Sequence, residues 1–412
     1  MSDTLITADS ILKEWYWGDK VTPQMITATP LLSKIKSTKE GIVSDVGGRR
    51  VVSALRTAFG QGLGARAAGD PLPTARNQQF ASINFGMKKM ISRVEVLGEA
   101  WRSTEGAGPK AFIALLRGSI NDALGSHAKE LNGTLYRDAT GLRTLVTVGA
   151  GPIAPAASAN ITVANAQYLT QGMLIDLYLA AVLVTNGSNV VVNSVDLETG
   201  IVNITNPNAG ALTVAVGNGV YRAGNKDKEI MGLDGIIGDL SGLATLQGIT
   251  VATNPFWRAK ELDNGGVPRA LTLDLMQQAF DASRAQTNEN PNLLIGDFVQ
   301  ERKYANLLVA QRQFRQENTT LKLDGGRASL DFNGVGFMTD TDCQAGRLYF
   351  VNTNYIRTFQ QTGYQWVTSP DAKFLWSRVA GFDSYEAVAI YEAEMAVTRR
   401  NTQAKLVDLI TP

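Results

Sequence analysis

The residue types that most often bind metals or carry out catalysis are almost absent from this chain. Its 412 residues include one histidine, His127, and one cysteine, Cys343. A zinc site needs several such ligands and a disulfide needs two cysteines, so a single chain cannot form either. Acid–base chemistry through an imidazole would depend on His127 alone. That residue lies beside Ala128 and Lys129 in a helical pattern, which favours an ordinary packed or partly exposed side chain.

Two carboxylates, Asp340 and Asp342, are the best candidates for a divalent cation. They alternate in the run TDTDC, and carboxylate oxygens are the ligands that hard cations prefer. The other interpretation is a solvated turn between two strands, because Asp is common in turns. The second interpretation has the stronger support in the sequence, so we expect no metal site.

Three short motifs only partly match catalytic or cofactor signatures. Glycines at positions 60, 62 and 64, and the run GAGPIA at 149–154, resemble phosphate-binding loops, yet neither joins a strand to a helix. Ser10 and Lys13 have S-x-x-K spacing, but the chain lacks the K-T-G and S-D-N segments that accompany it in known enzymes. We therefore expect no cofactor and no enzyme, although carboxylate or lysine chemistry stays open.

The composition indicates a folded chain with unusually few charges. Hydrophobic residues make up 44% and charged residues 19%, and 39 Lys and Arg nearly balance 38 Asp and Glu. A low charged fraction indicates surface that contacts other proteins. The first ten residues contain acids where a secretory signal carries basic residues, and the longest apolar run, 177–184, is too short to span a membrane. We expect a cytoplasm-like compartment, no export and no membrane partner.

The most polarised segment spans residues 47–93, which hold eight basic residues and one acid, Asp70. Alternating apolar residues predict strands over 50–59 and 80–96, and the Gly- and Pro-rich stretch between them predicts a long, protruding hairpin. We expect this hairpin to dock on a neighbouring subunit. Contact with nucleic acid and a solvated, charge-protected ribbon are the alternatives. The candidate contact residues are Arg49, Arg50, Arg56, Arg66, Arg76, Lys88, Lys89 and Arg93.

A long helix follows the hairpin. Apolar residues recur every three or four positions from Phe112 to Leu135, Pro109 suits the first turn, and Gly141 suits the exit. The pattern predicts a helix of about 30 residues, near 45 Å at 1.5 Å per residue, which is long enough to act as a spine.

Residues 142–226 form a separate compositional unit. No Lys or Arg occurs from Thr144 to Tyr221, and the only acids there are Asp176, Asp196 and Glu198. Short runs rich in Val, Thr and Asn, one of them over 180–185, alternate with turn residues, which predicts a small β-barrel or sandwich inserted into a larger fold.

The remainder has a mixed pattern of helices and strands. We predict a helix after Thr272, a buried strand over 292–297, a second helix ending near Arg315, and several strands between 328 and 400. The whole chain is therefore predicted to be α+β.

The order of these parts resembles the major capsid proteins of tailed bacteriophages, which share the Hong Kong 97-type shell fold. The runs at 233–240, 329–342 and 392–410 also look like that family. The resemblance implies an N-terminal arm, an extended β-hairpin loop, a peripheral domain with the spine helix, the inserted β-domain, an axial domain, and a C-terminal return to the peripheral domain. The corresponding residue ranges are 1–46, 47–96, 97–141, 142–226, 227–384 and 385–412.

The resemblance also implies a function. A protein of this family assembles as hexamers and pentamers into an icosahedral head that encloses double-stranded DNA, first in the host cytoplasm and then as part of the virion. About 45 residues precede the hairpin, so we expect a separate scaffolding protein, with portal and decoration proteins as further partners. A tail-tube or head-decoration subunit is the alternative, and a nucleic-acid-binding or enzyme module is a third class.

Overall fold

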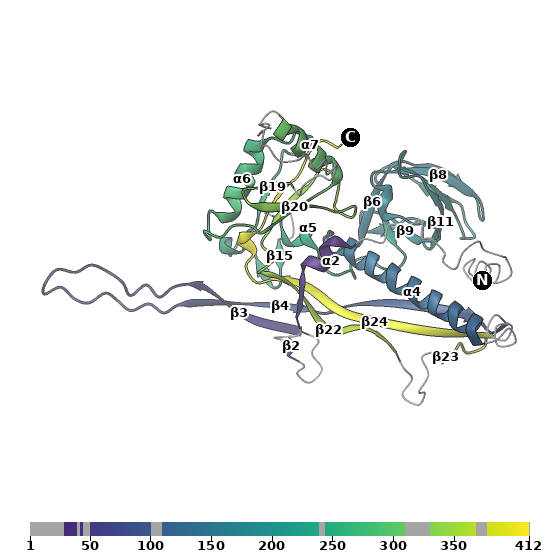
Figure 1. Cartoon of the computed structure of the whole chain (residues 1–412), viewed down its shortest axis with the longest axis horizontal. Helices are drawn as coiled ribbons and strands as arrows, with labels where there is room; N and C mark the ends of the chain where they lie inside the picture. The colour runs from purple at the N-terminus through teal and green to yellow at the C-terminus, as the bar shows by residue number, and fades with distance from the viewer. Residues whose placement is uncertain are drawn as a thin grey trace, which may run out of the picture. The chain divides into compact units, whose positions relative to one another are not determined.

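The computed structural model describes residues 29–38, 42–43, 50–99, 109–238, 244–309, 330–367 and 377–411. The chain divides into two compact units, which are described separately (Figure 1). The first unit comprises Met1–Thr29, Met87–Asn132 and Gln360–Ala393. The second unit comprises Pro30–Gly86, Gly133–Phe359 and Glu394–Pro412.

The first unit is a long helix packed on an antiparallel sheet. Its main strands are β5 (Lys88–Leu97) and β24 (Ser384–Val397), which pair from Leu97 opposite Ser384 to Lys88 opposite Ala393. Strand β23 (Ser377–Arg378) and the later part of β22 (Ile356–Trp366) complete the sheet. Helix α4 (Pro109–Thr134) packs on this sheet, because its His127 contacts side chains of β5, β22 and β24.

Helix α4 starts at Pro109 as predicted but ends earlier than the sequence indicated, at Thr134 and not near Gly141. The chain tightens there into a turn in which the Tyr136 N–H donates to the carbonyl of Gly133. The carbonyl of Leu135, which would continue the helix, accepts instead from Leu233 N at 2.7 Å. A hydrogen bond to a distant segment thus replaces the helical one, which local periodicity does not reveal.

The second unit contains a closed antiparallel β-barrel. Six strands pair in the order β9-β11-β12-β8-β6-β14, and a further pairing of β14 with β9 closes the ring. Strand β10 extends the sheet from β9, and β7 and β13 form a separate pair. The bounds are β6 Leu142–Val148, β7 Ala150–Ile153, β8 Ser158–Val163, β9 Leu174–Leu179, β10 Val182–Leu183, β11 Val190–Val195, β12 Ile201–Thr205, β13 Leu212–Val214 and β14 Gly219–Arg222.

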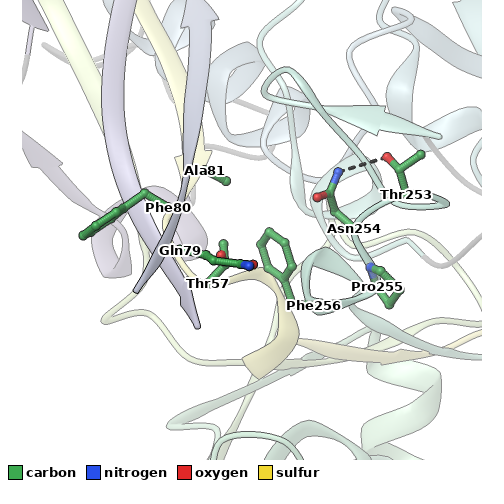
Figure 2. A pocket seen from close by; sticks show the side chains of 8 residues that line it. All are labelled: Thr57, Gln79, Phe80, Ala81, Thr253, Asn254, Pro255 and Phe256. Carbon is green, nitrogen blue, oxygen red and sulfur yellow. Dashed lines mark hydrogen bonds between the residues drawn. The ribbon is translucent and has the colours of Figure 1, made fainter. Parts of the chain in front are cut away.

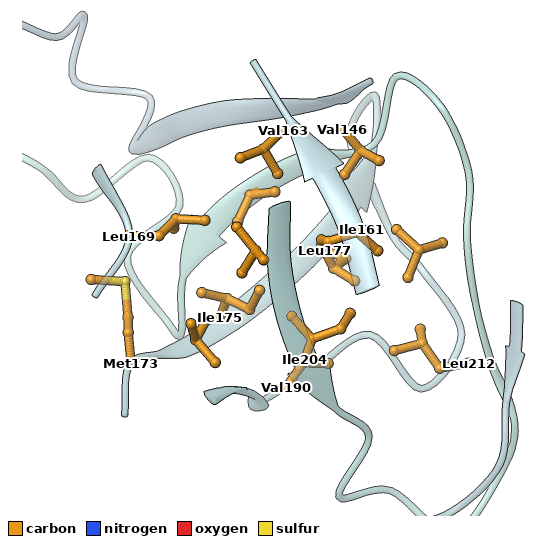
Figure 3. Close-up of a cluster of buried hydrophobic side chains, with 14 of the residues drawn as sticks. Val146, Ile161, Val163, Leu169, Met173, Ile175, Leu177, Val190, Ile204 and Leu212 are labelled. Atoms are coloured by element: carbon orange, nitrogen blue, oxygen red, sulfur yellow. The ribbon is translucent and has the colours of Figure 1, made fainter. Parts of the chain in front are cut away.

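The barrel has its own core of Val, Ile and Leu side chains from every strand of the ring (Figure 3). Alternation along β9, β11 and β12 places one face of each strand inside, so Ile175, Val190 and Ile204 are fully buried. The predicted strand over 180–185 is only partly correct. Ala180 and Ala181 form a turn, and β10 covers just Val182 and Leu183.

A mixed sheet with two helices forms the other core of the second unit. Its strand order is β17-β25-β21-β18-β20-β19, and side chains of α6 and α7 pack on it. The predicted helix after Thr272 is confirmed, since the Thr272 hydroxyl accepts from Leu275 N as an N-cap. The bounds are α6 Leu273–Arg284, α7 Phe298–Val309, β17 Lys260–Leu262, β18 Leu293–Gly296, β19 Asp331–Phe332, β20 Val335–Thr339, β21 Leu348–Val351 and β25 Ala404–Leu406.

A three-stranded ribbon projects from the second unit (Figure 1). It consists of β2 (Ile42–Val43), β3 (Arg50–Ala58) and β4 (Gln79–Gly86), paired in that order. Strand β1 (Lys36–Thr38) pairs in parallel with the first part of β22. The remaining short elements are α2 Pro30–Lys34, η1 Ala166–Tyr168, α5 Leu233–Ile236, β15 Thr245–Leu246, β16 Ile249–Thr250, η2 Pro255–Trp257 and η3 Arg400–Thr402.

Candidate functional site: the hairpin and its basic residues

The predicted strand over 50–59 is present as β3, but the predicted return strand over 80–96 is only partly correct. Strand β4 ends at Gly86 and pairs with β3, whereas residues 88–96 belong to β5, which pairs with β24 in a different sheet. Strands β3 and β4 are antiparallel from Arg50 opposite Gly86, with an irregularity between Arg56 and Ala58. Residues 59–78 connect them without helix or strand. This tip is held by a few hydrogen bonds, among them Gln61 N to the Arg76 carbonyl at 3.1 Å. Two nearly coreless strands and an irregular tip bury little surface by themselves.

Three of the predicted contact residues lie exposed on this hairpin. Arg56, Arg66 and Arg76 have no carboxylate within ion-pair distance in the part of the chain that the structure describes. The guanidinium carbon of Arg56 lies 5.1 Å from the centre of the Phe59 ring, a cation–π contact. These side chains therefore offer positive charge to an acidic partner.

Two other predicted residues form ion pairs within the chain. Lys89 Nζ lies 3.2 Å from Glu392, and Arg93 lies 2.7 Å from Glu386 and 3.2 Å from Glu95. The register places Glu95 directly opposite Glu386, so Arg93 lies between two like charges and offsets their repulsion. These three ion pairs stabilise the sheet of the first unit.

The other predicted contact residues are less informative. Lys88 is half-buried at the start of β5, and the backbone of Arg50 belongs to β3. Arg49 lies outside the described residues. A role of all eight basic residues between subunits stays a prediction.

Sequence reasoning missed the apolar side of the hairpin. Leu63 and Leu72 in the tip are 90% and 88% exposed, and Phe59 and Phe80 at the strand ends are also largely exposed. Single exposed apolar residues are common, but four on one hairpin form a larger exposed apolar surface than is usual. The signal was present as isolated Leu and Phe residues in a Gly- and Pro-rich stretch, where charge dominated our interpretation.

A shallow hollow lies where the hairpin strands meet the loop before η2 (Figure 2). Its volume is about 500 Å³. The side chains of Phe80 and Phe256 line it together with polar groups such as Gln79 and Asn254. No titratable side chain lines it, so it offers no side-chain acid or base. The lining residues are Thr57, Gln79, Phe80, Ala81, Thr253, Asn254, Pro255 and Phe256.

His127, the only histidine, is buried and packed against neighbouring side chains. His127 is 7% exposed, its Nδ1 lies 2.9 Å from Ser92 Oγ, and its ring contacts Tyr364 and Tyr391 edge-on. Burial lowers the pKa of His127 to about 4, against a smaller opposing influence of Glu130. At neutral pH the imidazole is therefore an uncharged core side chain.

The two candidate metal ligands are buried and not in a solvated turn, which corrects the stronger interpretation of the sequence. Asp340 Oδ2 accepts from the Tyr136 hydroxyl at 2.9 Å, and Asp340 Oδ1 accepts from Asp342 N at 2.9 Å. Burial raises the pKa of Tyr136, which keeps this donor protonated. Among the described residues, no group of three or more His, Cys, Asp or Glu is placed to hold a metal ion.

Neither glycine motif joins a strand to a helix. The glycines at 60, 62 and 64 lie in the exposed tip, and no helix begins there. Gly149 precedes β7, where an added Cβ would collide with the carbonyl of Val214. Ser10 and Lys13 lie outside the described residues. Among the residues that the structure describes, no helix has the length and hydropathy that a membrane span needs.

No protein-family model matches the chain, and no curated protein matches it in sequence. Solved structures, however, are similar to it over nearly its whole length. The capsid asymmetric unit of cyanophage A-1(L) is 15% identical, covers 96% of each chain and gives a TM-score of 0.57. The capsid of the native GTA particle is 8% identical, covers 100% of each chain and gives a TM-score of 0.53.

The capsid of the empty GTA particle is also similar, with 8% identity, coverage of 96% of this chain and 95% of the other, and a TM-score of 0.51. At these identities the likeness concerns the fold alone. The chain therefore has the mixed helix-and-sheet fold of these capsid structures, which confirms the predicted class of fold.

Proposed function

We propose that this protein is the major capsid protein of a tailed bacteriophage and builds the shell of the virion. Many copies associate as hexamers and pentamers into an icosahedral head that encloses double-stranded DNA. The observation that carries this proposal is the similarity of nearly the whole chain to capsid structures, above all to that of cyanophage A-1(L). In this proposal the polypeptide acts by assembling and not by catalysis.

The hairpin supports self-assembly independently of that similarity. Residues 59–78 expose both apolar and basic side chains at the tip of the ribbon, beyond buried Val51 and Ile83 at its base. The third strand of the ribbon, β2, is only two residues long, and a tip that extends beyond paired strands is marginal in water. A surface of a neighbouring copy would give this tip further contacts. We infer that Arg56, Arg66 and Arg76 face carboxylates of that copy, while Leu63 and Leu72 bury apolar area against it.

The charge balance is compatible with a shell around DNA. The formal net charge is +1, and the barrel carries no Lys or Arg between Thr144 and Tyr221. Each phosphate contact by a basic residue adds salt-dependent affinity, so a nearly neutral subunit holds DNA weakly and without sequence preference. This suits a container whose contents must leave.

The finer assignments belong to the same proposal. The ranges 1–46, 47–96, 97–141, 142–226, 227–384 and 385–412 correspond to arm, extended loop, peripheral domain, inserted β-domain, axial domain and C-terminal return. The closed ring of strands within 142–226, with a core separate from that of the mixed sheet, supports treating that range as an insertion. A separate scaffolding protein, a portal and decoration proteins are the proposed partners.

Electron microscopy of the chain, expressed alone and together with the neighbouring genes of its source, tests the proposal. Negative staining of the largest species should show closed polyhedral shells or hexameric capsomers. Tubes or stacked rings would instead support a tail subunit. A chain that stays monomeric in every condition would overturn the proposal.

A further inference from the structure

The sequence contains five Asn-Gly pairs, and each pair carries the atoms for one spontaneous reaction. The main-chain nitrogen of the glycine can attack the side-chain amide of the asparagine, because glycine has no Cβ to hinder the approach and its backbone adopts many conformations. Asparagine is accordingly among the thermolabile residues. The fold decides which pairs can react. The pairs are Asn132-Gly133, Asn186-Gly187, Asn218-Gly219, Asn264-Gly265 and Asn333-Gly334.

Three of these pairs are restrained by the fold. Asn132 is fully buried in helix α4. Asn218 is 1% exposed, and its side-chain oxygen accepts from Ala215 N at 2.7 Å. In the third pair the attacking atom is occupied, since the N–H of Gly187 donates to the Val184 carbonyl at 2.8 Å. We expect all three pairs to react slowly in the folded chain.

The pair at Asn333 is exposed but constrained. Asn333 and Gly334 form the two-residue loop between β19 and β20, with φ values of +50° and +77°. The Asn333 Nδ2 donates to Gln277 Oε1 at 2.9 Å. For the side chain to meet the next nitrogen, the backbone of Asn333 has to leave this turn, which the paired strands on both sides oppose.

Asn264 differs from the other four asparagines. Asn264 and Gly265 are both exposed in the loop after β17, and the φ of Asn264 is not positive. Asp408 holds this loop, because its Oδ2 accepts from Asn264 N at 2.8 Å and from Gly266 N at 2.9 Å. The N–H between these two, that of Gly265, makes no hydrogen bond within the part of the chain that the structure describes. The attacking nitrogen therefore belongs to an exposed residue and is not engaged.

The Asn264 side chain folds back over the same turn. Its Nδ2 donates to the Val267 carbonyl at 2.8 Å, and Val267 N donates to the Asn264 carbonyl at 3.2 Å. Between them, Gly265 and Gly266 have φ values of +64° and +79°, which glycine adopts without strain. The hydrogen bond that holds the side chain is exposed, so its net contribution is small. Little therefore prevents the amide carbon of Asn264 and the nitrogen of Gly265 from meeting.

We infer that Asn264 is a site of spontaneous deamidation through the nitrogen of Gly265. The Gly265 nitrogen forms a bond to the Asn264 side-chain carbon Cγ, and the bond from Cγ to Nδ2 breaks. Nδ2 leaves as ammonia with the proton that the Gly265 nitrogen loses, and a cyclic imide remains. Water then opens the imide at either carbonyl and gives aspartate or isoaspartate. The net reaction consumes one water and releases one ammonia, without any oxidant or reductant.

Deamidation changes the contacts that Asp408 makes. The isoaspartyl product has one more main-chain carbon between the two N–H groups that share Asp408 Oδ2, so their spacing no longer matches one oxygen. Asp408 lies in the C-terminal segment, where Ile410 N donates to the Arg269 carbonyl at 3.0 Å. We expect this segment to open more often after deamidation.

Peptide mapping of the full, folded chain tests the inference. The chain is incubated for several weeks at mildly alkaline pH, digested at acidic pH, and analysed by mass spectrometry for the replacement of an amide nitrogen by oxygen. We expect conversion at Asn264 to be about tenfold faster than at Asn333 or at the three restrained pairs. Conversion at Asn264 that is no faster than at Asn333 would overturn the inference.

The chemical route has its own readout. An enzyme that methylates isoaspartyl residues should label the peptide that contains Asn264, because opening of the imide gives isoaspartate. A product that contains aspartate alone would overturn the role of the Gly265 nitrogen. The label should be absent from this peptide in Asn264→Gln, because the longer side chain has to close a larger ring. A label that persists in that variant would place the reaction at another residue.

The unfolded chain is the matched control for the fold. In urea all five Asn-Gly pairs should convert at similar rates, because the restraints described above are then absent. A preference for Asn264 that persists in urea would show that its neighbours in sequence, and not the fold, select it, which would overturn the structural assignment.

Hydrogen exchange of fresh and deamidated chain tests the consequence for the C-terminal segment. The Ile410 N–H should exchange faster after deamidation, and an unchanged rate would overturn the expected opening. All of these measurements use the subunit alone, so their outcome is independent of whether shells form.

Discussion

The hairpin and the barrel differ in how far they bury their apolar side chains. The hairpin buries Val51 and Ile83 near its base but displays arginines and leucines along its tip, whereas the barrel closes its strands into a ring around sixteen buried side chains. The packed core favours the folded barrel, whereas the tip of the hairpin has little buried surface in the part of the chain that the structure describes. In our proposal the hairpin therefore contributes mainly to association, whereas the core of the barrel contributes to the stability of the subunit.

The largest effect should come from removing the hairpin tip. Replacing residues 61–76 by Asn-Gly leaves strands β3 and β4 joined by a tight turn, because Asn-Gly suits two-residue hairpins. We expect a folded subunit with unchanged circular dichroism and no shells. Velocity sedimentation and electron microscopy measure whether shells form. Normal shells from the shortened chain would show that assembly does not need the hairpin tip.

A subtler test keeps the tip and reverses its charge. Arg66→Glu with Arg76→Glu should leave folding intact, since both side chains are exposed, and should stop or strongly slow assembly. Arg93→Glu is the matched comparison, because Arg93 forms ion pairs within the chain. We expect its main effect in the unfolding midpoint. If Arg93→Glu impaired assembly as much as the Arg66→Glu and Arg76→Glu change, exposed arginines would not differ in role from arginines paired within the chain.

The barrel should respond through its core. Ile204 is fully buried among strands β8, β11 and β12, so Ile204→Ala removes packed volume and should cost the barrel about 2–5 kcal/mol of unfolding free energy. Because the barrel core is separate from that of the mixed sheet, we expect an added early transition in calorimetry while the helical signal persists. Loss of helix in the same transition would show a single cooperative core.

His127 gives the first unit a pH dependence. Its pKa in the folded chain is about 4, below the ordinary value of 6.5, so the unfolded chain binds more protons between those values. Stability from the neutral imidazole is complete above pH 6.5 and is lost as the pH falls through 4. Relative to His127→Gln, the wild-type unfolding midpoint should drop over this window. A constant difference between the two proteins from pH 7 to pH 4 would contradict this assignment.

The smallest effect is expected at the paired arginine of the sheet. Arg93→Ala leaves Glu95 opposite Glu386 without the cation between them, but all three side chains are partly exposed. Exposed ion pairs contribute about 1 kcal/mol or less, and salt screens them. The loss in urea unfolding should therefore shrink at high salt, and a loss that grows with salt would exclude an electrostatic cause.

Structural features that depend only on residues close together in the chain were predictable from the sequence. The outgoing strand of the hairpin follows from alternation, and the helix after Thr272 follows from its cap and spacing. Alternation did not show that the predicted return strand over 80–96 is divided between β4 and β5, which lie in different sheets. Features that depend on distant residues were not predictable. The closure of β14 on β9 joins segments about forty residues apart, and the end of α4 is set by Leu233, nearly a hundred residues beyond it.

The candidate site shows the same division. The sequence identified the basic residues of the hairpin, but it could not separate Arg66 from Arg93, because their difference lies in Glu386 on a strand far along the chain. It also placed Asp340 in a solvated turn, since the Tyr136 hydroxyl that pairs with it is 204 positions away. Contacts between residues far apart in the chain decide which charged side chains are paired, and the local sequence pattern does not contain this information.

An electron cryomicroscopy structure of the assembled particle tests the central claim most directly. We predict a closed shell in which residues 59–78 of each copy lie on an adjacent copy, with Leu63 and Leu72 buried there and Arg66 and Arg76 facing carboxylates. A shell in which the hairpin stays in solvent or folds back on its own chain would contradict the account.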